Sequence, residues 1–303
     1  MLFAEQALNG VQLGVTLFLL AAGLTLIFGI MGVINLAHGS LYMVGAYAAA
    51  YAAAQTGSTL TAVLAGLAGA SLVGMAVEFA VIRRLYDRDH LDQVLATFGL
   101  ILFFNQMAII LFGRQPLFVQ VPPPLAGALT IPPGLSFPVY RLAIIAVGLA
   151  VAVGLTLLIS RTRLGMLIRA GATHRDMVRA LGVDIRLLYT IVFGLGALLA
   201  GLAGVMAGPL LAVQVGMGEQ ILIMTFVVVV VGGVGSIRGA FYGALVVGIV
   251  DTMLRAFLPG LLRGVLVGPE ADALGAGLSS MGVYILMAAV LLIRPRGLFP
   301  APD

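Results

Sequence analysis

The sequence contains no cysteine and no lysine, and only 9% of its 303 residues are charged. Without cysteine there is no disulfide framework, no thiolate nucleophile and no cysteine-ligated metal. All sixteen basic residues are arginine. The chain therefore lacks the lysine that a Walker P-loop places on its phosphates, and a standard P-loop ATPase is excluded. The three histidines show no metal-site spacing, so no metal is predicted.

Hydrophobic residues, in contrast, are abundant and make up 61% of the sequence. A soluble domain carries roughly 25% charged residues, far more than this chain. The apolar runs are continuous rather than alternating, which is typical of membrane helices and not of a β-barrel. The sequence thus predicts an all-α polytopic membrane protein with a single transmembrane domain over residues 1–303. The net charge of +4 reflects membrane topology, and no nucleic-acid binding is expected.

The number of membrane crossings can be predicted from the apolar runs. A span needs roughly 20 apolar residues, and several runs are shorter. We therefore expect about eight or nine transmembrane helices, some of them broken or half-length. The first run has no positive region before it, which indicates a membrane helix and not a cleaved signal peptide. The runs cover about 8–32, 40–56, 59–82, 95–113, 140–160, 188–213, 220–235, 239–258 and 277–293.

Arginine is unevenly distributed between alternate loops. Twelve of the sixteen arginines fall in three loops and the C-terminal tail. Because arginine-rich loops stay in the cytoplasm, the C-terminus is predicted to be cytoplasmic, and nine crossings place the N-terminus outside. The twelve residues are Arg83, Arg84, Arg88, Arg161, Arg163, Arg169, Arg175, Arg179, Arg186, Arg238, Arg294 and Arg296.

The cytoplasmic loop at about 161–187 holds six arginines and a short amphipathic pattern. Thr173 is predicted to cap a helix over 174–181, and Gly182 to end it. Met177, Val178 and Leu181 would form its apolar face. Two interpretations remain open on residues alone, a basic loop that only fixes topology or a docking surface for a cytoplasmic partner.

Polar residues interrupt several apolar runs. Asn35 and His38 lie among glycines, which indicates either a broken helix on a transport pathway or a helix end at the interface. Glu219 is expected at an outside helix start, where a carboxylate suits the helix dipole. Glu78 and Asp251 could each face a pore, pair with an arginine or lie near an interface.

Three motifs together resemble one known family. They are INLAHGSLYMVGAY at 34–47, the basic loop that ends in ALGVD at 180–184, and VVVVVGGVGSIRGAFYGALVVGI at 227–249. In this order they resemble the permease subunits of branched-chain amino-acid ABC importers, and the resemblance runs from about Gly10 to Gly297.

The resemblance implies a bacterial inner-membrane permease that works with several partners. A second related permease, usually as a heterodimer, would complete the membrane core within the lipid bilayer. Two cytoplasmic ATPase subunits would bind ATP and Mg, and this chain would hold no cofactor and catalyse no reaction. A periplasmic binding protein would deliver leucine, isoleucine, valine or a related solute.

Residues are assigned to two roles, a path from the polar residues and glycines of the interrupted apolar run and a coupling role from the resemblance. The translocation path is expected at Asn35, His38, Gly39, Tyr42 and Gly45, where bulky substitutions at Gly39 or Gly45 should block transport and leave assembly intact. Coupling to the ATPase is expected at Arg175, Asp176, Met177, Val178, Arg179, Leu181 and Gly182. The general importer pattern is Glu-Ala-Ala, three residues, then Gly; Asp176 and Gly182 keep that spacing, but Met177 and Val178 replace the alanines.

Other functions remain open at this point. Similar permeases serve urea, short amides and other amino acids. An ion-coupled secondary transporter would need a buried acidic relay, for which only Glu78 and Asp251 are candidates without an evident partner. A membrane enzyme would need a polar cluster at one depth, which the sequence does not contain.

The predicted topology can be tested by labelling, because the native chain has no cysteine to interfere. Single cysteines would be introduced at positions 125 and 175. We expect an impermeant thiol reagent, added outside intact cells, to label position 125 and to reach position 175 only after the membrane is opened. Equal labelling of both positions from outside would contradict the orientation.

Overall fold

The computed structural model describes residues 2–130, 134, 136–173, 175–264 and 266–299, without the side chains of 175 and 176. The chain divides into two compact units. The first unit comprises Met1–Phe18, Pro122–Leu149 and Met224–Asp303, and the second comprises Leu19–Val121 and Ala150–Ile223. The single domain expected over 1–303 stays a prediction.

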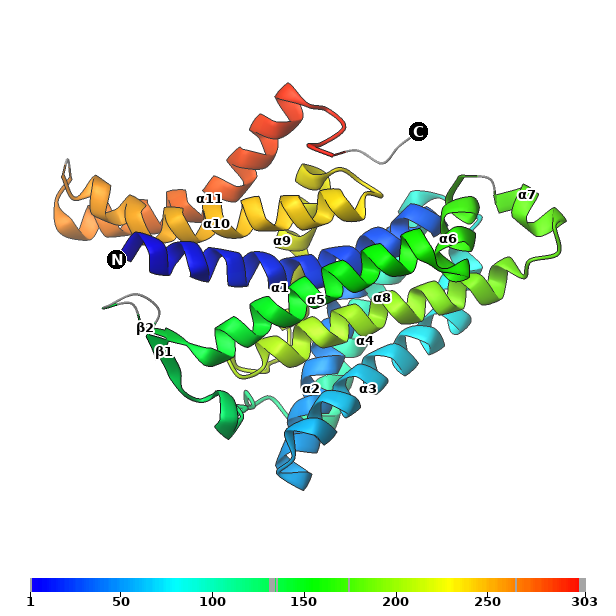
Figure 1. Ribbon diagram of the computed structural model, residues 1–303, viewed down its shortest axis with the longest axis horizontal. Coiled ribbons are helices and arrows are strands. Elements are labelled where there is room, and N and C mark those ends of the chain that lie inside the picture. The colour runs from blue at the N-terminus through cyan, green and yellow to red at the C-terminus, as the bar shows by residue number, and fades with distance from the viewer. Residues whose placement is uncertain (1, 131–133, 135, 174, 265, 300–303) are drawn as a thin grey trace. The chain divides into compact units, whose positions relative to one another are not determined.

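The described residues are mainly helical, as the apolar runs predicted, and the protein is an all-α polytopic membrane protein (Figure 1). Each of the nine apolar runs forms a helix, and two short helices lie between the fifth and sixth of them. The helices are α1 (Leu2–Met31), α2 (His38–Thr56), α3 (Thr59–Ala80), α4 (His90–Phe112), α5 (Val139–Arg161), α6 (Arg163–Thr173), α7 (Arg175–Ala180), α8 (Ile185–Ala207), α9 (Met217–Gly232), α10 (Ile237–Leu262) and α11 (Gly268–Ile293).

Among the described residues, seven helices are long and apolar enough to cross a membrane: α1, α3, α4, α5, α8, α10 and α11. The short apolar helix is α9, with 16 residues. The 19-residue α2 is less apolar because it begins with His38 and contains three tyrosines. The two helices outside this set of seven candidate spans are therefore α9, which is short, and α2, which is less apolar.

The remaining elements are short. Two 3-10 helices, η1 (Ile82–Leu85) and η2 (Pro123–Leu125), lie in the connections on either side of α4. Strands β1 (Ala128–Thr130) and β2 (Ser136–Pro138) form an antiparallel hairpin in which Leu129 pairs with Phe137. Between α4 and α5 the described residues thus contain one 3-10 helix and two short strands.

The second unit is built on α2, α3 and α8, which lie against one another (Figure 1). Small residues let these helices approach closely, as is typical of membrane helices. A Cβ added at Gly45 would lie 2.5 Å from the Cα of Gly201, and one added at Gly74 would lie 2.4 Å from the Cβ of Ala197. The Ser71 hydroxyl donates to the Gly194 carbonyl across the same contact, at 3.2 Å.

The first unit is built on α10, which packs on α11 and on the first half of α1. A Cβ added at Gly14 of α1 would lie 2.7 Å from the Ala244 carbonyl oxygen. Ser279 of α11 donates to the Leu254 carbonyl at 3.0 Å. After α11 the backbone of Leu298 and Phe299 pairs with the end of α9.

The glycine contacts make a stability prediction. Gly45→Ala should lower the stability of the protein by about 1–3 kcal/mol, because overpacking a tight contact displaces backbone. The matched control is Gly99→Ala in α4, where an added Cβ meets open space. Thermal unfolding in detergent measures both. The packing argument is wrong if the two variants unfold at the same temperature.

Candidate functional site

The connection between α1 and α2 is an irregular stretch over residues 32–37. Gly32 ends α1 with a φ of +66°, a value that favours glycine. Side chains then replace the missing helical hydrogen bonds. The Asn35 Oδ1 accepts from the Ala37 backbone N–H at 3.0 Å, and the Gln93 Oε1 accepts from the Ile34 N–H at 3.2 Å. One helix thus ends at Met31 and the next begins at His38; a transport pathway at this break stays a prediction.

All five residues predicted to line the path are buried: Asn35, His38, Gly39, Tyr42 and Gly45. The ring Nε2 of His38 lies 3.2 Å from the Leu20 carbonyl oxygen. Two of their polar atoms, Asn35 Nδ2 and His38 Nδ1, are buried with no hydrogen-bond partner. Such groups are costly away from water unless a solute or water molecule reaches them.

Three further buried atoms without a partner belong to the same unit, namely Thr25 Oγ1, Tyr47 OH and Asn105 Oδ1. They come from α1, α2 and α4, the helices on either side of the break or connected to it by Gln93. Tyr47 also stacks on Phe112 of α4, with ring centroids 4.8 Å apart. Unsatisfied polar groups are therefore concentrated in the second unit.

The start of α2 also touches the start of α9. A Cβ added at Gly39 would lie 2.2 Å from the Gly218 carbonyl oxygen, and one added at Gly218 would lie 2.3 Å from the Gly39 carbonyl oxygen. A Cβ at Gly45 has equally little room. Substitution at Gly39 or Gly45 will therefore disturb helix packing, and the expectation that it leaves assembly intact is not supported by this geometry.

The contact between Gly39 and Gly218 also bears on the expected position of α9. With the N-terminus predicted outside, the first crossing ends and α2 begins on the cytoplasmic side. Glu219, in contrast, was expected at an outside helix start. Residues in contact cannot lie on opposite surfaces of a membrane. With 16 residues, α9 is about 24 Å long, less than the roughly 30 Å of the hydrocarbon layer. The two expectations, a cytoplasmic start for α2 and an outside start for α9, therefore cannot both hold.

The predicted coupling segment forms α6 and α7. Gly182 has a φ of +86°, and the Val183 N–H donates to the Val178 carbonyl at 3.4 Å. Gly182 therefore ends the helix as predicted. The predicted cap is wrong, because Thr173 is the last residue of α6 and its hydroxyl donates to the Arg169 carbonyl.

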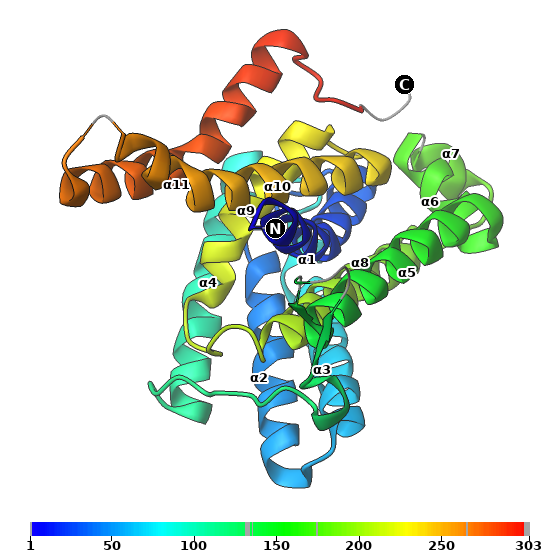
Figure 2. The same ribbon diagram turned by 60° about the vertical axis from the view of Figure 1, so that its left-hand side comes forward.

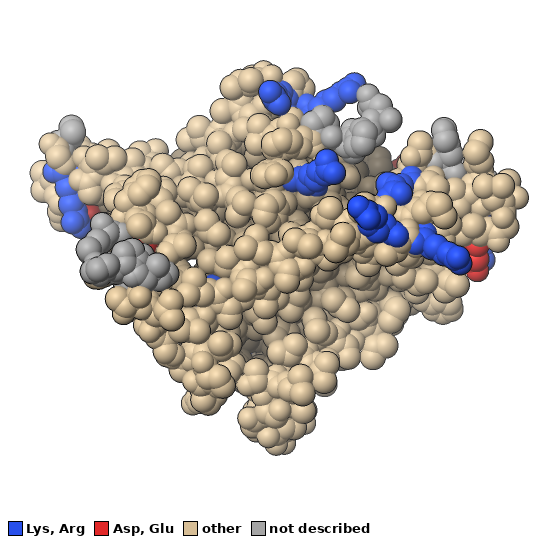
Figure 3. Space-filling model, in the orientation of Figure 1, with Lys and Arg blue, Asp and Glu red and all other residues tan. Residues whose placement is uncertain are grey.

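Two of the three residues predicted to form the apolar face of the coupling helix are exposed. Met177 is 64% exposed and Leu181 is 78% exposed, but Val178 is only 5% exposed. Val178 packs inside the chain and is not available to a partner in this structure. Arg179 is exposed, whereas the side chains of Arg175 and Asp176 lie outside the described part of the structure. Basic side chains gather around α6 and α7 at the right of Figure 3.

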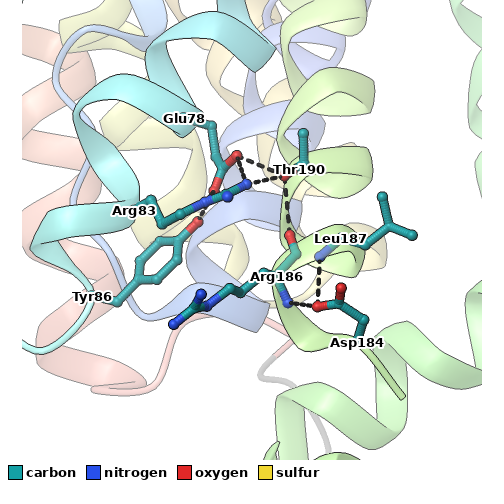
Figure 4. A network of polar contacts seen from close by, with 7 residues as sticks. All are labelled: Glu78, Arg83, Tyr86, Asp184, Arg186, Leu187 and Thr190. Atoms are coloured by element: carbon teal, nitrogen blue, oxygen red, sulfur yellow. Dashed lines mark hydrogen bonds and ion pairs between the residues drawn. The ribbon is translucent and has the colours of Figure 1, made fainter. Parts of the chain in front are cut away.

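A buried carboxylate connects the start of α8 to α3 (Figure 4). Glu78 of α3 is fully buried and forms an ion pair with Arg83 of η1 at 3.1 Å. The Thr190 hydroxyl of α8 donates to Glu78 Oε2 at 2.7 Å, and the Tyr86 hydroxyl donates to Glu78 Oε1. The hydrogen bond with Glu78 raises the pKa of Arg83, and burial raises the pKa of Tyr86.

The same region links α7 to the break. Asp184 follows α7 and caps α8 by accepting from the backbone N–H groups of Arg186 and Leu187. The next turn holds Tyr189, whose hydroxyl donates to the Ile30 carbonyl at the end of α1 at 3.4 Å. The ring of Tyr189 also packs edge-on against Tyr86.

Both buried acids that the sequence singled out have arginine partners. Glu78 pairs with Arg83, and Asp251 of α10 accepts from Arg255 Nε at 2.9 Å. Pairing with an arginine was one of the three alternatives that the sequence left open for each acid, and the partners lie only four or five positions away. Sequence reasoning missed Asn105, whose amide donates to the Glu219 carboxylate at 2.6 Å. The sequence did carry a signal for Asn105, because a polar amide within an apolar run needs a partner.

Comparisons with known proteins agree over almost the whole chain. The model of the family described as "Branched-chain amino acid transport system / permease component" matches residues 6–291. The permease protein BraD of the high-affinity branched-chain amino acid transport system of Pseudomonas aeruginosa is 31% identical, over 99% of this chain and 97% of the relative. No solved structure matches the chain.

Two further relatives are permease proteins named LivH. The one from Escherichia coli K12, of a high-affinity branched-chain amino acid transport system, is 28% identical over 99% of this chain and 96% of the relative. A probable branched-chain amino acid transport permease protein from Methanocaldococcus jannaschii is 27% identical over 93% of this chain and 88% of the relative.

The buried network around Glu78 makes a prediction. Glu78→Gln should destabilise the protein by about 1–3 kcal/mol, because it removes one partner of a buried ion pair, although Arg83 is partly exposed. The matched control is Asp272→Asn, since Asp272 and its partner Arg263 are both exposed and exposed pairs contribute little to stability. Thermal unfolding in detergent compares them, and equal losses would show that burial does not set the strength of the Glu78 pair.

Proposed function

Because the chain belongs to the family of branched-chain amino acid transport system permease components, we propose that it is the membrane permease subunit of an ABC importer. In this proposal the chain moves leucine, isoleucine, valine or a related small solute into the cell. Separate ATPase subunits supply the energy, and a periplasmic binding protein delivers the solute. The orientation is N-terminus periplasmic and C-terminus cytoplasmic.

The family match over residues 6–291 is the observation that carries the proposal. It covers nearly all of the described helices, and the relatives are named as permease proteins of branched-chain amino acid transport. The absence of lysine supports an external source of energy, because a P-loop needs that residue. ATP and Mg would accordingly be bound by two partner ATPases, and a second related permease would complete the membrane core.

The coupling role is assigned to α7. Met177 of α7 and Leu181, which directly follows α7, are large exposed apolar side chains. Exposed apolar residues that share a surface are typical of a docking site. We place them in a groove of the ATPase, with Arg179 at the rim. Gly182 supports this role by holding the end of α7 in its left-handed conformation.

An ion-coupled mechanism has less support. A proton or sodium relay needs a buried acid that is free to exchange its partner. Glu78 and Asp251 are each held by an arginine at about 3 Å, an arrangement that favours a structural role. The unpartnered polar atoms around the break in α1–α2 support a path for a polar solute at that place.

Docking through α7 predicts that apolar contact dominates coupling. Leu181→Asp should abolish substrate-stimulated ATP hydrolysis in the assembled transporter, because burial of one such side chain is worth roughly 1.5–3 kcal/mol. Arg179→Gln should weaken it about twofold to fivefold, since a rim charge contributes about 0–1 kcal/mol. ATPase assays of the purified complex with its binding protein measure both effects.

The matched control is Val267→Asp, which makes the same apolar-to-acid change at an exposed position in the segment predicted to lie outside. It should leave stimulated hydrolysis unchanged. If Leu181→Asp couples normally and Arg179→Gln does not, electrostatic attraction rather than the apolar face carries the contact with the ATPase.

A further inference from the structure

Glu219 is an acidic residue without an arginine partner in the described structure. It lies in the first turn of α9 and is partly buried. Its carboxylate accepts a hydrogen bond from Asn105 of α4, whose Nδ2 lies 2.6 Å from Glu219 Oε1. Both residues belong to the second unit. The helices concerned, α4 and α9, can be followed beside α2 in Figure 2.

The orientation of the Asn105 amide is fixed by this hydrogen bond. Because the carboxylate can only accept, the amide nitrogen faces Glu219 and the other terminal atom is the oxygen. That oxygen, Asn105 Oδ1, is buried with no partner. No described residue donates to Glu219 Oε2 either. The pair therefore presents two acceptor oxygens, one of which is charged, and no donor to satisfy them.

Asn105 lies well inside α4, which is one of the helices long and apolar enough to cross a membrane. Asn105 is fifteen residues after His90, the first residue of α4, which is about 22 Å along a helix of 23 residues. Gly218 precedes Glu219 and contacts Gly39 at the start of α2, beside the break. The other ion pairs of the described chain use arginine to neutralise an acid, so an amide partner here leaves the charge available to a ligand.

Elementary chemistry then restricts the ligand. A carboxylate in the membrane faces a partner or an aqueous path, not lipid. The N-terminal end of α9 favours negative charge at this position. Two unsatisfied acceptors beside a negative charge suit a group with several N–H donors, no acceptor and a positive charge, which describes a primary ammonium. A substrate carboxylate would be repelled from the same place.

We propose that Glu219 and Asn105 bind the ammonium group of the amino-acid substrate during its passage. The inference rests on the proposed function. Glu219 supplies the charge-assisted hydrogen bond, and Asn105 both orients Glu219 and accepts a second N–H through Oδ1. Solutes without an ammonium group, such as urea, lack the cation that this site requires.

The test uses the complete transporter with its binding protein in proteoliposomes. Glu219→Gln keeps the shape and removes the charge, and we expect kcat/KM for leucine uptake to fall at least tenfold. Glu219→Asp should recover part of that loss, and Asn105→Leu should lose less than Glu219→Gln because the charge remains. The matched control is Glu270→Gln, which changes an exposed carboxylate in the first turn of α11 and should transport as the wild type does.

The outcomes separate this inference from the proposed function. If the wild type transports no amino acid, the proposed function fails. If the wild type transports leucine and Glu219→Gln does so equally well, the ammonium site is wrong. Subunit stoichiometry is measured first, and loss of a subunit from Glu219→Gln would make Glu219 an assembly contact and overturn the proposal. Replacement of Na⁺ by choline distinguishes an inorganic cation: if wild-type uptake needs Na⁺ and Glu219→Gln does not, the carboxylate holds that ion and the proposal is overturned.

Discussion

The hydrocarbon interior of a membrane supplies no hydrogen bonds, so the chain must satisfy its own polar groups wherever it crosses. Continuous helices meet this requirement over most of the sequence. The break between α1 and α2 meets it with side chains, since Asn35 and Gln93 accept from backbone N–H groups that no helix satisfies. The same break leaves Asn35 Nδ2 and His38 Nδ1 without partners. The place where regular structure stops is therefore also the place with unused hydrogen-bonding capacity.

Buried carboxylates also need partners, and the described structure supplies two kinds, an arginine or an amide. Glu78 and Asp251 each pair with an arginine on the same or an adjoining segment. The contacts of Glu78 connect α3 to α8 and to the turn after α3, whereas the Asp251 pair lies within α10. Glu219 is held by an amide instead, which orients its carboxylate without cancelling its charge. The first arrangement stabilises the structure, and the second keeps an electrostatic attraction for a cation. The partner of each acid, more than its depth, decides what it can do.

The short helix α7 and the break between α1 and α2 are connected by a short series of contacts. Asp184 begins α8 directly after α7, Thr190 one turn later reaches Glu78, and Tyr189 reaches Ile30 at the end of α1. A displacement of α7 would thus act on the residues that hold the break in place. The exposed Met177 and Leu181 are where a partner could apply such a displacement.

The sequence by itself determined the class of protein, the positions of its helices and several of its ends. Continuous apolar runs leave no alternative to helices in lipid, and glycine at position 182 is favoured by the left-handed conformation that ends α7. The sequence could not determine which side chains meet. Val178 looks exposed on a helical pattern but is buried, and Asn105 and Glu219 are 114 positions apart in the chain. Only the tertiary structure decided these contacts, because helix packing depends on the joint fit of many small residues and not on the local pattern of any one segment.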